Sequence, residues 1–125
     1  MGNTPAELVG TWSEAMCTVE GVSVTERTMG CLQLVISPDG KWKNVLEGAV
    51  VSEGTLTADN TSTPKRVAFT FAKSRQWHGI GKVVNSIYEI EDNKLRISGG
   101  KPGAASPPRI GNGSGIQHEE YDRIS

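Results

Sequence analysis

Two glutamates, Glu14 and Glu119, are the residues of this chain best suited to acid–base chemistry. Each lies in a segment where polar and apolar residues alternate, so each side chain would share a face with apolar neighbours. A carboxyl group in apolar surroundings has a raised pKa and can give or take a proton near neutral pH. Tyr88 and Tyr121 could orient a ligand carbonyl through their hydroxyl groups. We therefore interpret Glu14, Glu119 and Tyr88 as candidate catalytic residues.

Each of these candidates also has a purely structural interpretation. Buried charges are normally paired, so Glu14 could instead pair with Arg123 or point into solvent. Glu119 is only four residues from Arg123 and could serve a structural or surface role. Tyr88 and Tyr121 could be ordinary core tyrosines whose hydroxyl groups bond to the backbone or to water. The sequence alone leaves both interpretations open.

Other catalytic signatures are missing from the sequence. It contains no Ser-His-Asp order and no Gly-rich nucleophile turn, and Gly79-Ile80-Gly81 is too short for a phosphate loop. It has no Cys-x-x-Cys and no histidine pair at ligand spacing, so we expect no metal and no cofactor. Cys17 and Cys31 could bridge if their strands pair, but two reduced thiols are the favoured interpretation. His78 could belong to a lid or act as a proton shuttle near neutral pH, but a solvated loop histidine is the favoured interpretation, and we interpret His118 as a surface residue.

Length and charge narrow the class of protein. With 125 residues, the chain is long enough for one domain with a core and too short for two, so we expect a single domain over 1–125. The 13 basic residues nearly balance the 14 acidic ones and form no block, which argues against a nucleic-acid partner. We find no leader-like start and no apolar run of membrane-spanning length. The expectation is a soluble cytoplasmic monomer or homodimer with no membrane partner.

Eight short strands would position the candidate residues. Alternating segments occupy 10–18, 32–37, 41–47, 51–57, 66–72, 83–90, 94–98 and 116–124, and most are joined by links of hairpin length that are rich in Gly, Pro, Asn and Asp. Before them, Thr4 could cap a short helical turn with Pro5 at its first position. The spacing predicts an all-β fold, an eight-stranded up-and-down antiparallel β-barrel with a short N-terminal helical turn.

Strand alternation predicts which side chains share the inside of this barrel. If Trp12 points inward, so do Glu14 and Met16, and an inward Arg123 implies inward Tyr121 and Glu119. We expect Arg123 to stack on Trp12 and close one end. The predicted ligand-binding residues are Trp12, Met16, Leu34, Trp42, Asn44, Phe69, Phe71, Tyr88, Tyr121 and Arg123. Such a mostly apolar lining with a few polar groups is typical of a small-molecule site.

Three segments resemble a known family. Leu8-Val9-Gly10-Thr11-Trp12 is similar to its Leu-x-Gly-Thr-Trp opening; the stretches 53–56 with 64–67, and 87–97, match two further motifs. On these motifs the chain resembles the small lipocalin-like domains of planctomycetes and other bacteria. The resemblance implies a barrel that binds a small apolar molecule, and some lipocalin-like barrels act as cofactor-free cyclases or isomerases. Glu14 departs from an apolar position of the family pattern.

Three functional hypotheses remain at this point. The first is a binding module that holds a small hydrophobic or aromatic molecule in the barrel lumen without changing it. The second is a cofactor-free cyclase or isomerase of natural-product biosynthesis, with Glu14 or Glu119 moving a proton and Tyr88 or Tyr121 polarising a carbonyl. The third is an interaction module whose barrel is fully packed. The sequence does not decide whether the protein is an enzyme.

Overall fold

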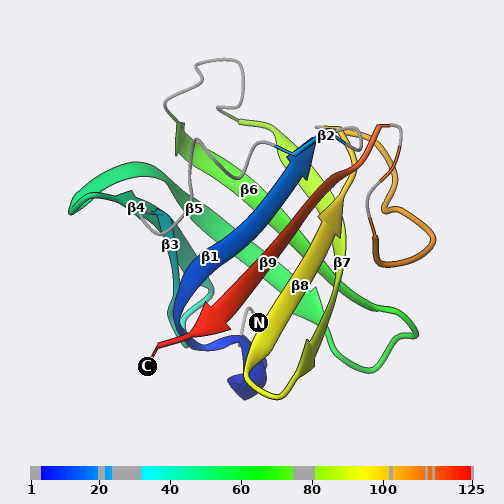
Figure 1. Cartoon of the computed structure of the whole chain (residues 1–125), viewed down its shortest axis with the longest axis horizontal. Coiled ribbons are helices and arrows are strands. Elements are labelled where there is room, and N and C mark those ends of the chain that lie inside the picture. Colours follow the sequence, from blue (N-terminus) through cyan, green and yellow to red (C-terminus); the bar gives the residue numbers. More distant parts are fainter. Residues whose placement is uncertain are drawn as a thin grey trace.

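Eight antiparallel strands close into a barrel in the computed structural model (Figure 1). The structure describes residues 4–19, 22–23, 32–74, 81–101, 103–111, 113 and 115–124. Its elements are the 3-10 turn η1 (Ala6–Leu8) and the strands β1 (Gly10–Val19), β2 (Val22–Ser23), β3 (Leu32–Ile36), β4 (Lys41–Leu46), β5 (Ala49–Asp59), β6 (Lys65–Ser74), β7 (Val83–Glu91), β8 (Lys94–Gly99) and β9 (Gln117–Arg123). No helix in the described part is long and apolar enough to cross a membrane.

The strands follow one another around the barrel in chain order, and β1 pairs with β9 to close it. The two-residue strand β2 adds only a short pairing to the far end of β1, at Thr18 and Val19. The predicted eight-stranded up-and-down architecture is therefore confirmed. Closure leaves the eight strands of the barrel without a free edge along most of their length, which protects a small β domain from pairing with other chains.

Turn residues explain why the hairpins form where they do. Asp92 and Asn93, between β7 and β8, both have positive φ angles of 53° and 62°. Two such residues in succession make the tight turn whose twist suits a two-residue hairpin. Gly40, after Pro38 and Asp39, has a φ of 83° and donates its amide to the carbonyl of Ser37. Both turns were predicted from residue type.

The N-terminal turn closes one end of the barrel, which we call the floor (Figure 1). It buries Leu8 completely. Pro5, rather than Thr4, is the residue that precedes η1, and the turn has no side-chain cap. The prediction of a Thr4 cap was wrong because the Thr4 hydroxyl donates to the Ser37 carbonyl (2.9 Å) and ties the N-terminal segment to the end of β3.

Trp12 and Arg123 fill the space above η1. The Arg123 guanidinium lies 4.1 Å from the centre of the Trp12 ring, which confirms the expected stacking. Arg123 also donates to the carbonyls of Val9 (2.9 Å) and Glu7 (2.7 Å), and the Trp12 indole N–H donates to the carbonyl of Leu8 (3.0 Å). These bonds satisfy backbone groups of the turn. The pair therefore fastens the floor to the barrel.

A β-bulge in β1 changes which residues face inward. Glu14 pairs with Tyr121, but the next paired residues are Met16 with Glu120 and Cys17 with Glu119. Because directly opposed residues share a face of the sheet, Cys17 joins Glu14 inside the barrel and Met16 faces outward. The prediction that Met16 lines the lumen was therefore wrong. The extra residue of the bulge moves every later side chain of β1 to the other face.

The segment between β8 and β9 folds against the outer face of the barrel. Its backbone donates from Gly100 and Gly103 to carbonyls of β7, and the Asn85 side chain donates to the carbonyl of Ala104. This segment covers His118, which faces outward as predicted but is only 3% exposed. The prediction that His118 lies at the surface was wrong because alternation gives the face of a strand and not what packs on it.

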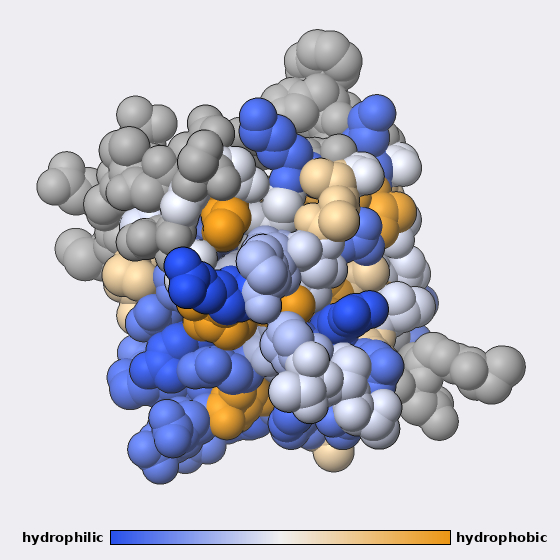
Figure 2. Space-filling view, turned by 90° about the vertical axis from the view of Figure 1, so that its right-hand side faces the viewer, coloured by the Kyte–Doolittle hydropathy of each residue, from blue (hydrophilic) through white to orange (hydrophobic). Residues whose placement is uncertain are grey.

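The outer face of the barrel on the side of β7 is largely polar (Figure 2). Figure 2 shows mainly hydrophilic residues with separate hydrophobic ones, and no continuous hydrophobic area, on the side of the barrel that carries β7. Among the described residues, the exposed large hydrophobic side chains are Val83 and Ile124. On this side, the described residues therefore offer little continuous apolar surface (Figure 2).

Candidate functional site

Exposure of the inward-facing side chains rises from the floor to the opposite end, which we call the mouth. On β6, Val67 is 1% exposed, whereas Phe69 and Phe71 farther along are only partly buried. On β9, Tyr121 is 3% exposed, Glu119 is partly buried and Gln117 is exposed. The lumen is therefore sealed by packing at the floor and reached by solvent from the mouth.

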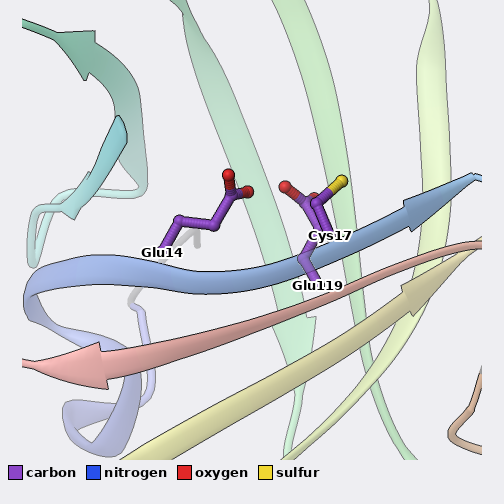
Figure 3. Close-up of side chains that lie close together, drawn as sticks. All are labelled: Glu14, Cys17 and Glu119. Carbon is purple, nitrogen blue, oxygen red and sulfur yellow. The ribbon is translucent and has the colours of Figure 1, made fainter. Parts of the chain in front are cut away.

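Glu14, Cys17 and Glu119 come together inside this lumen (Figure 3). Glu14 and Cys17 project from β1 and Glu119 from β9, and one carboxyl oxygen of each glutamate and the Cys17 sulfur lie within 4.8 Å of one another (Figure 3). Glu14 is 2% exposed and Cys17 is 4% exposed. The inward direction of both glutamates follows the predicted alternation. Cys17 was missed because the bulge was not visible in the sequence.

Glu119 is the one potential hydrogen-bond donor to Glu14 among the described residues. Both carboxyl oxygens of Glu14 are buried without a partner, apart from the neighbouring carboxyl of Glu119, with which they can share a proton. The alternative in which Glu14 pairs with Arg123 was wrong, because that guanidinium is taken up by Trp12 and by the backbone of the floor. Asn44, which faces the same lumen from β4, has a buried Oδ1 that also lacks a partner. Native proteins leave few such groups unsatisfied.

The carboxyl pair strongly perturbs the pKa values around it. Burial, the proximity of Glu14 and its negative charge raise the pKa of Glu119 well above its ordinary value. Hydrogen bonds from Tyr121 (2.8 Å) and Gln117 oppose this shift without cancelling it. Burial raises the pKa of the Cys17 thiol to about 12, with further contributions from both glutamates. Cys17 is therefore held in its neutral, protonated form at pH 7, and the equilibrium of Glu119 is shifted toward its protonated form.

Aromatic rings line another part of the lumen. The centre of the Trp42 ring lies 4.8 Å from that of Phe71 and 5.5 Å from that of Phe69, and both pairs pack edge to face. Gly54 makes this possible, because it lies on β5 between Trp42 on β4 and Phe71 on β6. A Cβ at Gly54 would lie 1.8 Å from the carbonyl oxygen of Thr70. The predicted lining residues Trp42, Phe69 and Phe71 thus form one wall, with the buried Leu34 on β3 beside it.

Tyr88 does not join the carboxyl pair. Its hydroxyl donates to Glu7 (2.8 Å), which also forms an ion pair with Lys65 (2.9 Å) at the floor. Burial acts to raise the pKa of Glu7, but the hydrogen bonds from Lys65 and Tyr88 and the charge of Lys65 hold it below its ordinary value. Tyr88 therefore fastens η1 to β6 and β7. Its predicted role with Glu14 and Glu119 has no geometric support.

Sequence reasoning missed a second polar cluster, on the outer face. Ser98 lies 2.7 Å from His118 Nδ1, and His118 Nε2 lies 2.9 Å from Glu120. The order resembles a nucleophile, a base and an acid, but the Ser98 hydroxyl is fully buried and also bonds to both backbone groups of Gly111. This cluster fastens Gly111, in the connection between β8 and β9, to the barrel. No local motif could reveal it, because Ser98 and His118 are 20 residues apart.

Two other features offer less chemistry. Glu14, Cys17 and Glu119 are the one group of three potential metal donors among the described residues, but a metal would have to displace the proton of a thiol whose pKa is about 12.

An open groove of about 420 Å³ on the outside of β5, β6 and β7 is lined mainly by small and polar side chains such as Thr57, Asn85 and Ser106. The described residues that line this groove include no buried charged group.

Comparison of the chain with protein-family models, with curated proteins and with solved structures gave no match. The predictions that fall on Cys31 and His78 lie outside the described residues. Within the described part, the site that combines burial, unsatisfied polar atoms and perturbed pKa values is the interior of the barrel.

Proposed function

We propose that this protein binds a small hydrophobic or aromatic molecule in the lumen of its barrel. The observation that carries the proposal is the set of buried oxygen atoms on Glu14 and Asn44, which have no hydrogen-bond partner among the described residues apart from the proton that Glu119 can share with Glu14. A bound molecule would supply their hydrogen bonds, while the rings of Trp42, Phe69 and Phe71 would bury its apolar part. The partial exposure of Phe71 gives such a molecule a surface to contact from the mouth.

The resemblance to lipocalin-like domains agrees with this proposal, since barrels of that kind bind small apolar molecules. The resemblance, the bacterial source, the cytoplasmic location and the choice between monomer and homodimer remain predictions. Fold likeness alone does not establish a function, so the proposal depends on the lumen.

Binding of the neutral dye Nile red tests this proposal. Its emission shifts to the blue in apolar surroundings, and titration of the protein should give a saturable shift. Phe71→Leu should weaken binding about three- to tenfold, because it removes ring contacts from the aromatic wall. Thr70→Ala is the matched control, since Thr70 is the adjacent residue and faces outward. Failure of the dye to bind, or equal binding by both variants, would contradict the proposal.

A cofactor-free isomerase or cyclase is the second candidate function. One specific observation favours it: Glu119, whose pKa is raised, lies beside Glu14, which places a proton-holding group next to a second carboxyl in a largely apolar lumen. One carboxylate would take a proton from a carbon next to a carbonyl, and the carboxyl group of the pair would return a proton to the rearranged product. Exchange of the α-hydrogens of 2-tetralone in D2O, followed by NMR, tests for this activity. Glu14→Gln should abolish any exchange that the protein accelerates.

A further inference from the structure

The lumen carries acidic groups without a matching cation. The ion pairs of the described residues lie at the floor or on the outer face, and none includes Glu14 or Glu119. Two cations at the floor are engaged elsewhere: Arg123 stacks on Trp12 and bonds to the backbone, and Lys65 pairs with Glu7. Burial of a charge is expensive unless it is paired, so a cation that entered this lumen would be strongly favoured.

The unsatisfied atoms share one hydrogen-bonding role. Glu14 Oε1, Glu14 Oε2 and Asn44 Oδ1 are all oxygen atoms that accept hydrogen bonds in the ionised carboxylate and the amide. A ligand that satisfies them must therefore donate several hydrogen bonds. An ammonium group offers three N–H donors and one positive charge, whereas a carboxylate or a sulfate offers acceptors and would be repelled.

The aromatic wall suits the same ligand. The faces of Trp42, Phe69 and Phe71 carry negative potential and attract cations, and the same rings pack against an aromatic body. In the circular strand order, β1 with the acidic groups and β6 with the two phenylalanines are four strands apart, which places them on opposite sides of an eight-stranded barrel. A molecule with an apolar ring and a short ammonium arm matches both sides at once.

We propose that the ligand is a small aromatic amine in its protonated form, with its ammonium group held by Glu14 and Glu119 and its ring packed against Trp42, Phe69 and Phe71. This inference rests on the proposed function and specifies the ligand class. The groups that face Glu119 are Glu14 and Cys17 from β1 and Gln117 and Tyr121 from β9, while Ile97 from β8 brings no charge. An entering cation favours the ionised form of Glu119, so binding should release a proton and strengthen as the pH rises.

Three indoles that differ in charge test the inference by titration calorimetry. Tryptamine is a cation, 3-ethylindole is its neutral counterpart, and indole-3-propionate is an anion. Tryptamine should bind at least tenfold more tightly than 3-ethylindole, and indole-3-propionate most weakly, in a buffer that contains EDTA to exclude divalent cations. From pH 6 to pH 8 the affinity for tryptamine should rise by up to about tenfold per pH unit, while that for 3-ethylindole stays constant.

Variants connect this preference to the carboxyl pair. Glu14→Gln should reduce the tryptamine preference to less than about threefold, whereas Glu53→Gln, an exposed glutamate on β5, should leave it unchanged. If Glu14→Gln does not fold, Glu119→Gln replaces it as the test variant, and it should weaken the pH dependence of tryptamine binding because one of the two carboxyl groups of the pair no longer titrates.

The outcomes separate this inference from the proposed function. Binding of Nile red or 3-ethylindole with no preference for tryptamine would overturn the amine inference and leave the binding function in place. A preference for indole-3-propionate would overturn it as well. If neither the indoles nor Nile red bind, the proposed function fails and the amine inference fails with it.

Discussion

Replacement of both lumen glutamates should change how the stability of the protein depends on pH. Burial and the neighbouring carboxyl raise the pKa of Glu119 above its ordinary value of 4.5, so the folded protein keeps a proton that the unfolded chain releases. The stability that this proton provides is complete below about pH 4.5. It decreases as the pH rises toward the pKa of the folded state. The wild-type protein should therefore lose stability as the solution becomes neutral and then alkaline.

The size of the effect follows from one retained proton. Each pH unit between the two pKa values changes the free energy of unfolding by at most about 1.4 kcal/mol. From pH 5.5 to pH 7.5 the pair should therefore contribute a decrease of up to about 2.7 kcal/mol. Because Glu14 and Glu119 interact, this proton belongs to the pair and not to one residue. Only the double variant Glu14→Gln/Glu119→Gln removes it completely.

Urea unfolding at a series of pH values measures this contribution. The difference between the wild type and the double variant isolates the pair from all other titrating groups, including His118. Glu53→Gln serves as the control for removal of an exposed carboxyl group, and its pH dependence should match the wild type. Parallel curves for the wild type and the double variant would refute the conclusion that the carboxyl pair keeps a proton in the folded protein that the unfolded chain releases.

Two further predictions concern the frame of the site. Gly54→Ala should destabilise the protein by about 3 kcal/mol or prevent folding, because the new Cβ would clash with the Thr70 carbonyl. Thermal unfolding measures this loss of stability. The control is Gly48→Ala, at an exposed glycine with a φ of 84°, where the substitution introduces backbone strain but no clash. Ser98→Ala should lower the free energy of unfolding by about 1–3 kcal/mol and hasten proteolysis within 100–116, because His118 and Gly111 lose a buried hydrogen-bond partner. Unchanged proteolysis would show that this cluster does not hold the segment.

Much of the fold was predictable because its signals are local. Asp92 and Asn93 specify a hairpin by residue type, and strand alternation specifies a face once one residue of a strand is placed. On the first and last strands, the inward direction expected for Trp12 and Arg123 gave this starting point. Since these two strands close the barrel, Glu14 and Glu119 could be assigned to the same lumen from the sequence alone.

The failures have equally specific causes. The bulge between Glu14 and Met16 contains no Gly or Pro, so nothing in the sequence shows that Cys17 takes the inward position. The burial of His118 depends on a segment that returns over the barrel, and this is a contact between distant residues. Hydrogen-bond partners such as Glu7 for Tyr88 likewise depend on how η1 packs. Local patterns specify direction, whereas partners follow from tertiary packing.

The carboxyl pair of Glu14 and Glu119 is the place where this protein departs from the rules that the rest of its fold obeys. A pair of buried acids without a cation among the described residues lowers stability at neutral pH, and two apolar side chains would pack there at less cost. Departures of this kind concentrate at functional sites. A structural role would require the pair to stabilise the β1–β9 closure, and the double variant would then be weaker at every pH. A functional role instead predicts that the double variant equals or exceeds the wild type above neutral pH, while it loses the preference for the protonated amine.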